Sequence, residues 1–183
     1  MRGVMAAAAL GLAACTGAPA PAEAPVVGCA ASVEQSWAPA GGAAYRLGAH
    51  AQGARCADAV LTLVVADAEG KPLYASAHLA QFLFGFEEVS SPEAMQTALR
   101  DWLDPSRQPY VSTAELPDWP EGAAGPSGEF PLSPEAWLDR AGYQALRAKA
   151  APVFCHVQGR ESLACLALEG EQVEQFALQS FPG

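Results

Sequence analysis

The chain has 183 residues, which is enough for one compact domain with a hydrophobic core. It carries 20 acidic and 10 basic residues, for a net charge of −10, and its lysines are Lys71 and Lys149 alone. This balance excludes a polybasic patch and argues against nucleic acid and anionic lipid surfaces as partners.

The first 14 residues have the layout of a secretory signal peptide. Arg2 supplies a positive charge, residues 3–12 form an apolar segment, and small residues follow. The apolar segment is too short to span a bilayer as a permanent helix. We therefore expect residues 1–14 to be removed, which leaves nine basic against 20 acidic residues and a net charge of −11.

The signal peptide runs into Leu12-Ala13-Ala14-Cys15, an aliphatic residue, two small residues and a cysteine. This stretch resembles the lipobox of bacterial lipoproteins. The resemblance implies cleavage before Cys15, a diacylglycerol on its thiol and anchoring by acyl chains such as palmitate. In lipoproteins of two-membraned bacteria, Asp after the cysteine favours inner-membrane retention, so Thr16 favours the periplasmic face of the outer membrane. The alternative is ordinary secretion, with cleavage after Ala20-Pro21-Ala22.

Residues 15–25 are predicted to be the lipidated cysteine and a Pro/Ala tether, because residues 16–25 read TGAPAPAEAP. At about 3.1 Å per residue such a segment reaches roughly 30 Å. It would hold the domain near a membrane without touching it. Residues 26–183 are expected to form that domain, a single α+β periplasmic unit.

The first half of the domain reads mainly as strands. Alternation of apolar and polar residues over 45–50 predicts a half-exposed strand, and VLTLVVA over 60–66 predicts a fully buried one. Residues 67–70 form a turn into a strand over 73–77. A short helix is expected over 78–83.

Two helices carry start signals. Ser90 or Ser91, followed by Pro92-Glu93, opens a helix over 92–103, which ends at Asp104-Pro105. Its apolar stripe consists of Met95, Leu99, Trp102 and Leu103. Ser133-Pro134-Glu135 predicts a second helix, interrupted near Gly142, with a stripe of Trp137, Leu138, Ala141, Ala145 and Leu146.

With Cys15 used for lipid attachment, four cysteines remain: Cys29, Cys56, Cys155 and Cys165. Exported chains keep disulfides, and three pairings are formally possible. Strands over 153–158 and 162–168 around the turn 159–161 form a hairpin that sets Cys155 opposite Cys165. We therefore expect Cys155–Cys165 and Cys29–Cys56. The inward face of this hairpin would be Val153, Cys155, Val157, Leu163, Cys165 and Ala167.

A last strand is expected over 172–180. Strands at both ends of the domain with helices between them predict an α+β fold: an antiparallel sheet with two or three helices packed on one face, and two disulfides.

The segment 105–132 is the first candidate for contact with a partner. It holds six prolines and three aromatic residues, Tyr110, Trp119 and Phe130. Trp119, flanked by Asp118 and Glu121, is suited to stack on a sugar ring or a peptide. The alternative is that the segment covers the sheet, with Trp119 as a plug. The candidate contact residues are Trp119, Asp118, Glu121 and Tyr110.

No motif for nucleophilic catalysis, metal binding or phosphate binding is present, and no cofactor is expected. His50, His78 and His156 are scattered, and His156 is expected to be a surface residue or a satisfied polar residue on a strand face with Phe154. The carboxylates that a hydrolase would draw on are Glu87, Glu88, Asp118, Glu121 and Glu129.

The sequence therefore predicts a non-catalytic, lipid-anchored cell-envelope protein that interacts with another envelope component, such as a basic protein. Two alternatives stay open. One is an envelope hydrolase acting on glycan or peptide, with two of the five carboxylates converging. The other is a carrier of a small apolar ligand, with a cavity lined by Phe82, Phe84 and Phe86.

Overall fold

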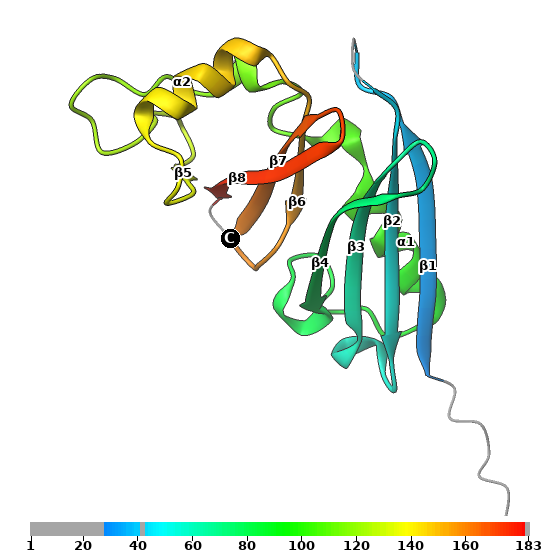
Figure 1. Ribbon diagram of the computed structural model, residues 1–183. Helices are drawn as coiled ribbons and strands as arrows, with labels where there is room; N and C mark the ends of the chain where they lie inside the picture. The colour runs from blue at the N-terminus through cyan, green and yellow to red at the C-terminus, as the bar shows by residue number, and fades with distance from the viewer. Residues whose placement is uncertain (1–27, 41–42, 182–183) are drawn as a thin grey trace, which may run out of the picture.

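The computed structural model describes residues 28–40 and 43–181, which form two four-stranded antiparallel sheets and two α-helices (Figure 1). The predicted α+β class is confirmed, but the strands divide between two sheets where one was expected. Residues 1–14, Cys15 and the tether 15–25 lie outside the described residues. In chain order the regular elements are β1 (Cys29–Trp37), β2 (Tyr45–Gly53), β3 (Val60–Asp67), β4 (Pro72–Leu79), α1 (Pro92–Leu103), β5 (Leu132–Pro134), α2 (Arg140–Lys149), β6 (Val153–Val157), β7 (Ser162–Glu169) and β8 (Gln172–Ser180).

The first sheet has the order β1-β2-β3-β4, in which each strand pairs with the next along the chain. Alternate residues point to one apolar face, including Leu47, Leu61 and Leu63, which are fully buried. The other face is open to solvent, so the prediction of a fully buried strand over 60–66 is wrong. The predicted helix over 78–83 is also wrong, because β4 continues to Leu79 and only a 3-10 turn, η2 (Ala80–Phe82), follows.

The second sheet has the order β5-β8-β7-β6. Its β6–β7 hairpin has the predicted register, with Cys155 opposite Cys165. Both predicted disulfides are confirmed: Cys155–Cys165 within this hairpin, and Cys29–Cys56, which ties the start of β1 to the 3-10 turn η1 (Cys56–Asp58). The last strand, β8, has the predicted bounds.

Helix α1 is confirmed over 92–103, with Ser91 accepting a hydrogen bond from the Ala94 amide as its N-cap. Its predicted apolar stripe is buried and packs against β1 and β2. The second helix begins later than predicted. Residues 132–134 form β5 on β8, and Asp139, not Ser133, caps α2, which runs through Gly142 without interruption.

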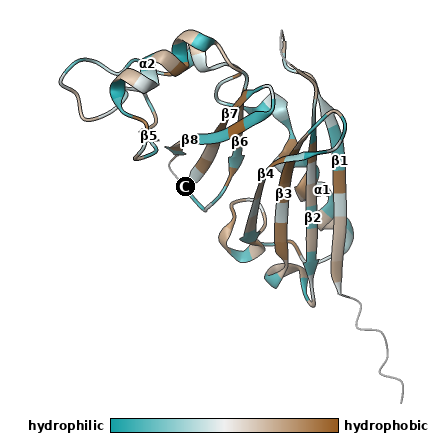
Figure 2. Cartoon of the chain, in the orientation of Figure 1, coloured by the Kyte–Doolittle hydropathy of each residue, from teal (hydrophilic) through white to brown (hydrophobic). Residues whose placement is uncertain are grey.

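The two sheets share one hydrophobic core. Buried residues of β2, β3 and α1 form a single cluster with Phe154, Leu166 and Leu168 of the second sheet. The opposite face of the second sheet forms another cluster with Tyr143 and Leu146 of α2. In Figure 2 apolar colour runs along β3 and along the β6–β7 hairpin of the neighbouring sheet. Strands β6 and β7 are thus buried on both faces.

Among residues 28–40 and 43–181, no helix is long and apolar enough to cross a membrane.

Candidate functional site

The imidazole of His156 is the buried polar group around which the site is built. In β6 Cys155 packs in the cluster that includes α2, and strand alternation directs Phe154 and His156 to the opposite face. That face meets the first sheet, so His156 is 1% exposed. The prediction that His156 is a surface residue or a satisfied polar residue is wrong. The hairpin is buried on both faces, and not only on the face that carries the disulfide.

Aromatic rings surround His156. Its ring centroid lies 5.9 Å from that of Trp102 on α1 and 6.2 Å from that of Phe154. From β4, Tyr74 and His78 approach to 6.1 and 5.8 Å. The site therefore joins α1, β4 and β6, three elements far apart in the sequence.

One carbonyl fixes the orientation of the site. The Val157 carbonyl accepts a hydrogen bond from Trp102 Nε1 at 2.8 Å and lies 3.2 Å from His156 Nδ1. Because a carbonyl only accepts, Nδ1 carries the imidazole proton and Nε2 is left as an acceptor. His156 Nε2 is buried, with no hydrogen-bond partner among the described residues.

Burial lowers the pKa of His156 from 6.5 to about 4, because the imidazolium ion cannot be solvated there. The hydrogen bond to the Val157 carbonyl opposes this shift, and the neighbouring His78 adds to it. Burial also lowers the pKa of His78. At neutral pH His156 is therefore an uncharged ring with one free acceptor.

His156 lines a cleft of about 270 Å³, which we name the His156 cleft. The loop 84–86 forms one wall, Trp102 and the C-terminal part of α1 another, and residues 155–157 of β6 a third. At the charged side of the cleft, Arg107 pairs with Asp101 at 3.3 Å and with Asp104 at 3.4 Å. The cleft thus combines the rings of Phe84, Phe86 and Trp102 with aliphatic side chains, a charged rim and one buried acceptor.

The loop 84–86 forms the wall of the cleft that is most open to solvent. Phe84 and Gly85 are exposed, and Gly85 has a φ of +86°, with open space where a Cβ would lie. The Phe84 amide donates to the Gly159 carbonyl at 3.2 Å, which attaches the loop to the β6–β7 turn. Phe84 and Gly85 therefore form an exposed side of the cleft.

A serine contacts the second histidine. Ser76 Oγ lies 3.0 Å from His78 Nε2 on β4. A serine nucleophile needs a base that a third group orients, usually a carboxylate. The hydrogen bonds of the described residues give His78 no carboxylate partner, so the pair lacks this third group.

The contact residues predicted around Trp119 lie elsewhere, beside α2. Trp119 is partly buried, packs edge-on against Tyr143 at 5.5 Å, and donates from Nε1 to the Ala123 carbonyl at 2.9 Å. Asp118 is exposed and pairs with Arg147 at 3.0 Å. This geometry is that of a covering segment with Trp119 as its plug. The remaining two predicted residues are Tyr110, partly buried with its pKa raised by that burial, and Glu121, exposed in the loop.

The carboxylates proposed for a hydrolase belong to separate loops. Glu87 accepts from the Gly85 amide, whereas Asp118 pairs with Arg147 of α2. All five carboxylate residues are exposed. In the parts of the chain that the structure describes, no group of three or more His, Cys, Asp or Glu could hold a metal ion.

The sequence did not indicate this site, because the strand face that carries His156 and Phe154 was not expected to be covered. The signal that would have found it is Phe154, an apolar residue two positions away on the same face of β6. A strand with Cys155 on one face and Phe154 on the other is typical of a sheet covered on both sides.

The fold and site define a disulfide-bonded α+β protein with an aromatic cleft over a buried neutral histidine. No protein-family model, curated protein or solved structure matches the chain.

Proposed function

We propose that this chain is a non-catalytic, lipid-anchored protein of the cell envelope that binds another envelope protein through the His156 cleft. Lipid on Cys15 would hold it at the periplasmic face of the outer membrane. The observation that carries the binding function is the unpartnered Nε2 of His156 in a cleft of aromatic side chains. A buried acceptor without a partner destabilises a protein by about 1–3 kcal/mol, which a ligand donor can recover.

The size and chemistry of the cleft favour one side chain of a partner. At about 270 Å³ it lies just below the range of about 300–1,000 Å³ in which drug-sized ligands are enclosed. This favours an interaction module over a carrier of a whole apolar molecule. The group that fits is an aromatic ring with a hydrogen-bond donor, as in Trp or Tyr, which also dominate protein interfaces.

The net charge of −11 that remains without residues 1–14 supports a basic partner, because opposite charges speed encounter. Association with such a partner should weaken sharply as the salt concentration rises. Binding that is insensitive to salt contradicts the basic partner.

The ligand is tested with N-acetyl-tryptophanamide, N-acetyl-tyrosinamide and N-acetyl-phenylalaninamide. Calorimetry uses the mature protein in phospholipid nanodiscs, with empty nanodiscs as the blank for probe partitioning. The phenylalanine probe lacks a side-chain donor and should bind about tenfold more weakly, since an unmet acceptor is worth about 1.4 kcal/mol here.

His156→Phe keeps a buried ring and removes the acceptor, so it should abolish the preference among the three probes. Phe84→Ser removes an exposed wall of the cleft and should weaken all three. Trp137→Ser, at a similarly exposed aromatic residue outside the cleft, should change neither the affinity for the probes nor the preference among them. Equal affinity for the three probes in the wild-type protein contradicts the proposal.

The anchor is tested by mass spectrometry of the mature N terminus. We expect the N-terminal peptide to begin at Cys15 and to carry a diacylglycerol and a further acyl chain. A peptide that begins at Glu23 would show ordinary secretion.

A further inference from the structure

Four exposed apolar side chains lie at one end of the first sheet: Val60, Leu79, Phe82 and Phe84, here named the Phe82 patch. Val60 and Leu79 are cross-strand partners, 45% and 39% exposed, and the Ala80 amide donates to the Ala59 carbonyl beside them. Phe82 is 58% and Phe84 52% exposed. Phe84 also packs edge-on against Phe181 at 5.7 Å.

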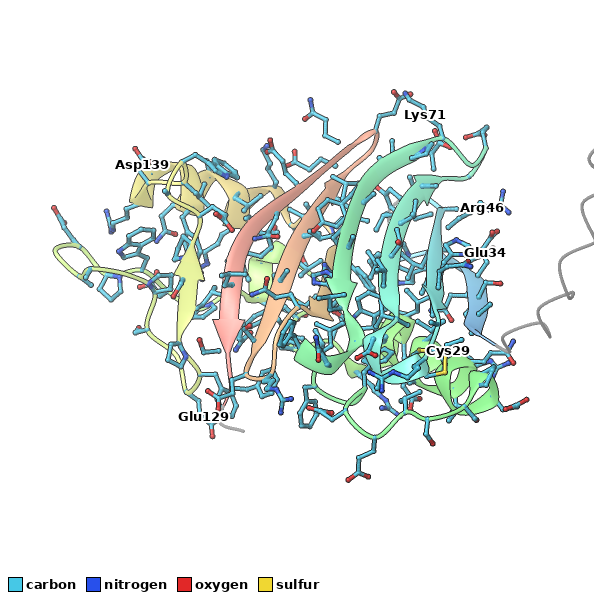
Figure 3. The ribbon with its side chains drawn as sticks, turned by 90° about the horizontal axis from the view of Figure 1, so that it is seen from below. Cys29, Glu34, Arg46, Lys71, Glu129 and Asp139 are labelled. Carbon is cyan, nitrogen blue, oxygen red and sulfur yellow. A yellow bond between two sulfur atoms is a disulfide. The ribbon has the colours of Figure 1, made fainter. Side chains whose placement is uncertain are left out.

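This end of the sheet is also where the described chain begins. Cys29 starts β1 beside the end of β2, and its disulfide joins Cys56 of η1, four residues before Val60. In Figure 1 the start of β1 and the end of β4 lie at the same lower end of the sheet. Figure 3 shows Cys29 at the opposite end of the first sheet from Lys71, which lies in the β3–β4 turn.

We propose that the Phe82 patch rests on the surface of the membrane that holds the lipid of Cys15. The inference depends on the proposed lipid anchor. Residues 16–27 join Cys15 to the described domain, so the chain between anchor and patch is short. Contact of the patch with the bilayer is then intramolecular, and a short linker gives it an effective concentration in the millimolar range. Four partly exposed side chains suffice for such a contact, although they would not recruit a free protein.

The contact with the leaflet is apolar and not electrostatic. The chain carries twice as many acidic as basic residues and so offers little positive charge to lipid headgroups. Near the patch, Arg55 is paired with Asp58, the exposed Arg160 donates to the Gln81 carbonyl at 2.9 Å, and Glu87 and Glu88 are exposed. A predominantly zwitterionic leaflet therefore suits the patch, and added salt should not release it. The tether then serves to place the domain on the leaflet, and not merely near it.

The Phe82 patch and the His156 cleft share Phe84. Contact with the leaflet therefore places the mouth of the cleft next to the membrane surface. A partner presenting a Trp or Tyr side chain at the interface, where these residues concentrate, would meet the cleft there.

The test uses the mature lipidated protein in vesicles of phosphatidylethanolamine with a minor share of phosphatidylglycerol and a photoactivatable phospholipid. After irradiation, labelling is mapped by peptide mass spectrometry. We expect label on residues 79–84 and little on Trp137, which is as exposed as Phe82 but lies before α2.

Phe82→Ser should lower labelling of the segment 79–84 about fivefold, because it removes one half-exposed ring from the contact. Phe82 does not line the His156 cleft, so probe binding should stay unchanged. Trp137→Ser is the matched control and should leave the labelling of 79–84 as it is. Thermal unfolding of each variant checks that the fold is intact.

Equal labelling of Trp137 and the segment 79–84 overturns the proposal, as does unchanged labelling in Phe82→Ser. Release by salt shows an electrostatic contact and also overturns it. If the N-terminal peptide carries no lipid, both the anchor and the patch proposal fail. Acylated protein with uniform labelling defeats the patch proposal alone.

Discussion

The stability of this protein should fall between pH 6.5 and pH 4 because of His156. In the unfolded chain its imidazole takes up a proton near its ordinary pKa of 6.5, whereas in the folded protein it does so only near 4. The stability that this difference represents is fully present above pH 6.5 and is lost as the pH falls toward 4. A difference of this size corresponds to about 3 kcal/mol, since one pKa unit is worth about 1.4 kcal/mol. At 1% exposure the ring has little solvent screening to reduce this figure.

The assay is urea unfolding at a series of pH values, followed by tryptophan fluorescence. His156→Phe removes the proton-binding site, so its free energy of unfolding should decline far less over this range. His50→Gln, at an exposed histidine, is the matched control and should follow the wild type. Burial also lowers the pKa of His78, so His78→Gln should remove a further part of the decline.

The carboxyl groups whose pKa is lowered contribute mainly at more acidic pH. Hydrogen bonds within the chain lower the pKa of Glu93 and Asp104 from 4.5 and 3.8, so their stabilisation is lost below those values. The decisive window is therefore from pH 6.5 to about 4.5. If the wild type and His156→Phe lose the same stability in that window, the buried neutral histidine is refuted.

Three further predictions concern stability. Cys29→Ala/Cys56→Ala should reduce the free energy of unfolding by about 3.5 kcal/mol, because the bond closes a separation of 27 residues; chemical denaturation checks this. Leu99→Ala, at a fully buried position of α1, should cost about 2–5 kcal/mol in the same assay, and a loss below 1 kcal/mol would contradict its place in the core. Asp118→Asn should change stability by less than about 1 kcal/mol, because its ion pair with Arg147 is largely exposed; a larger loss would show that the pair fixes the covering segment.

The elements that could be predicted are those whose signals are local. Helix α1 carries its cap, its proline and its apolar stripe within residues 91–103, and the structure reproduces its bounds. The β6–β7 hairpin is fixed by its short turn and by the pairing of Cys155 with Cys165. Each needs only neighbours along the chain.

The elements that could not be predicted depend on partners distant in the sequence. Ser133-Pro134-Glu135 has the chemistry of a helix start, yet the Glu135 amide donates to the Phe176 carbonyl and residues 132–134 pair with β8. Asp139 offers a second cap, whose side chain accepts from the Gly142 amide, and α2 begins there. Strand pairing therefore outweighs the first cap, and nothing within residues 133–136 indicates that β8 lies alongside.

Strand β1 was not predicted because its inward face is built from unlike residues, Cys29, Ala31, Val33, Gln35 and Trp37. Gln35 reaches across the fold and donates to the Leu103 carbonyl at 2.6 Å, which satisfies the C-terminal end of α1. A polar residue on the inward face is explained only by that helix end. The periodicity of β1 therefore becomes visible only once α1 is in place.

The same dependence on distant partners explains why the candidate site escaped detection. Cys155 lies on the face of β6 that meets α2, and strand alternation therefore places His156 on the face that meets Trp102 and β4. There the ring keeps an unpartnered acceptor, although an apolar ring of similar size would leave nothing unpaired. On stability alone, phenylalanine at position 156 is therefore favoured over histidine, both at neutral pH and more strongly in acid. A residue that lowers stability in a well-packed core needs a reason in function, because active and binding sites are where such local costs are usually found. The cleft supplies that reason, because it has space for a ligand ring whose hydrogen-bond donor would bind His156 Nε2.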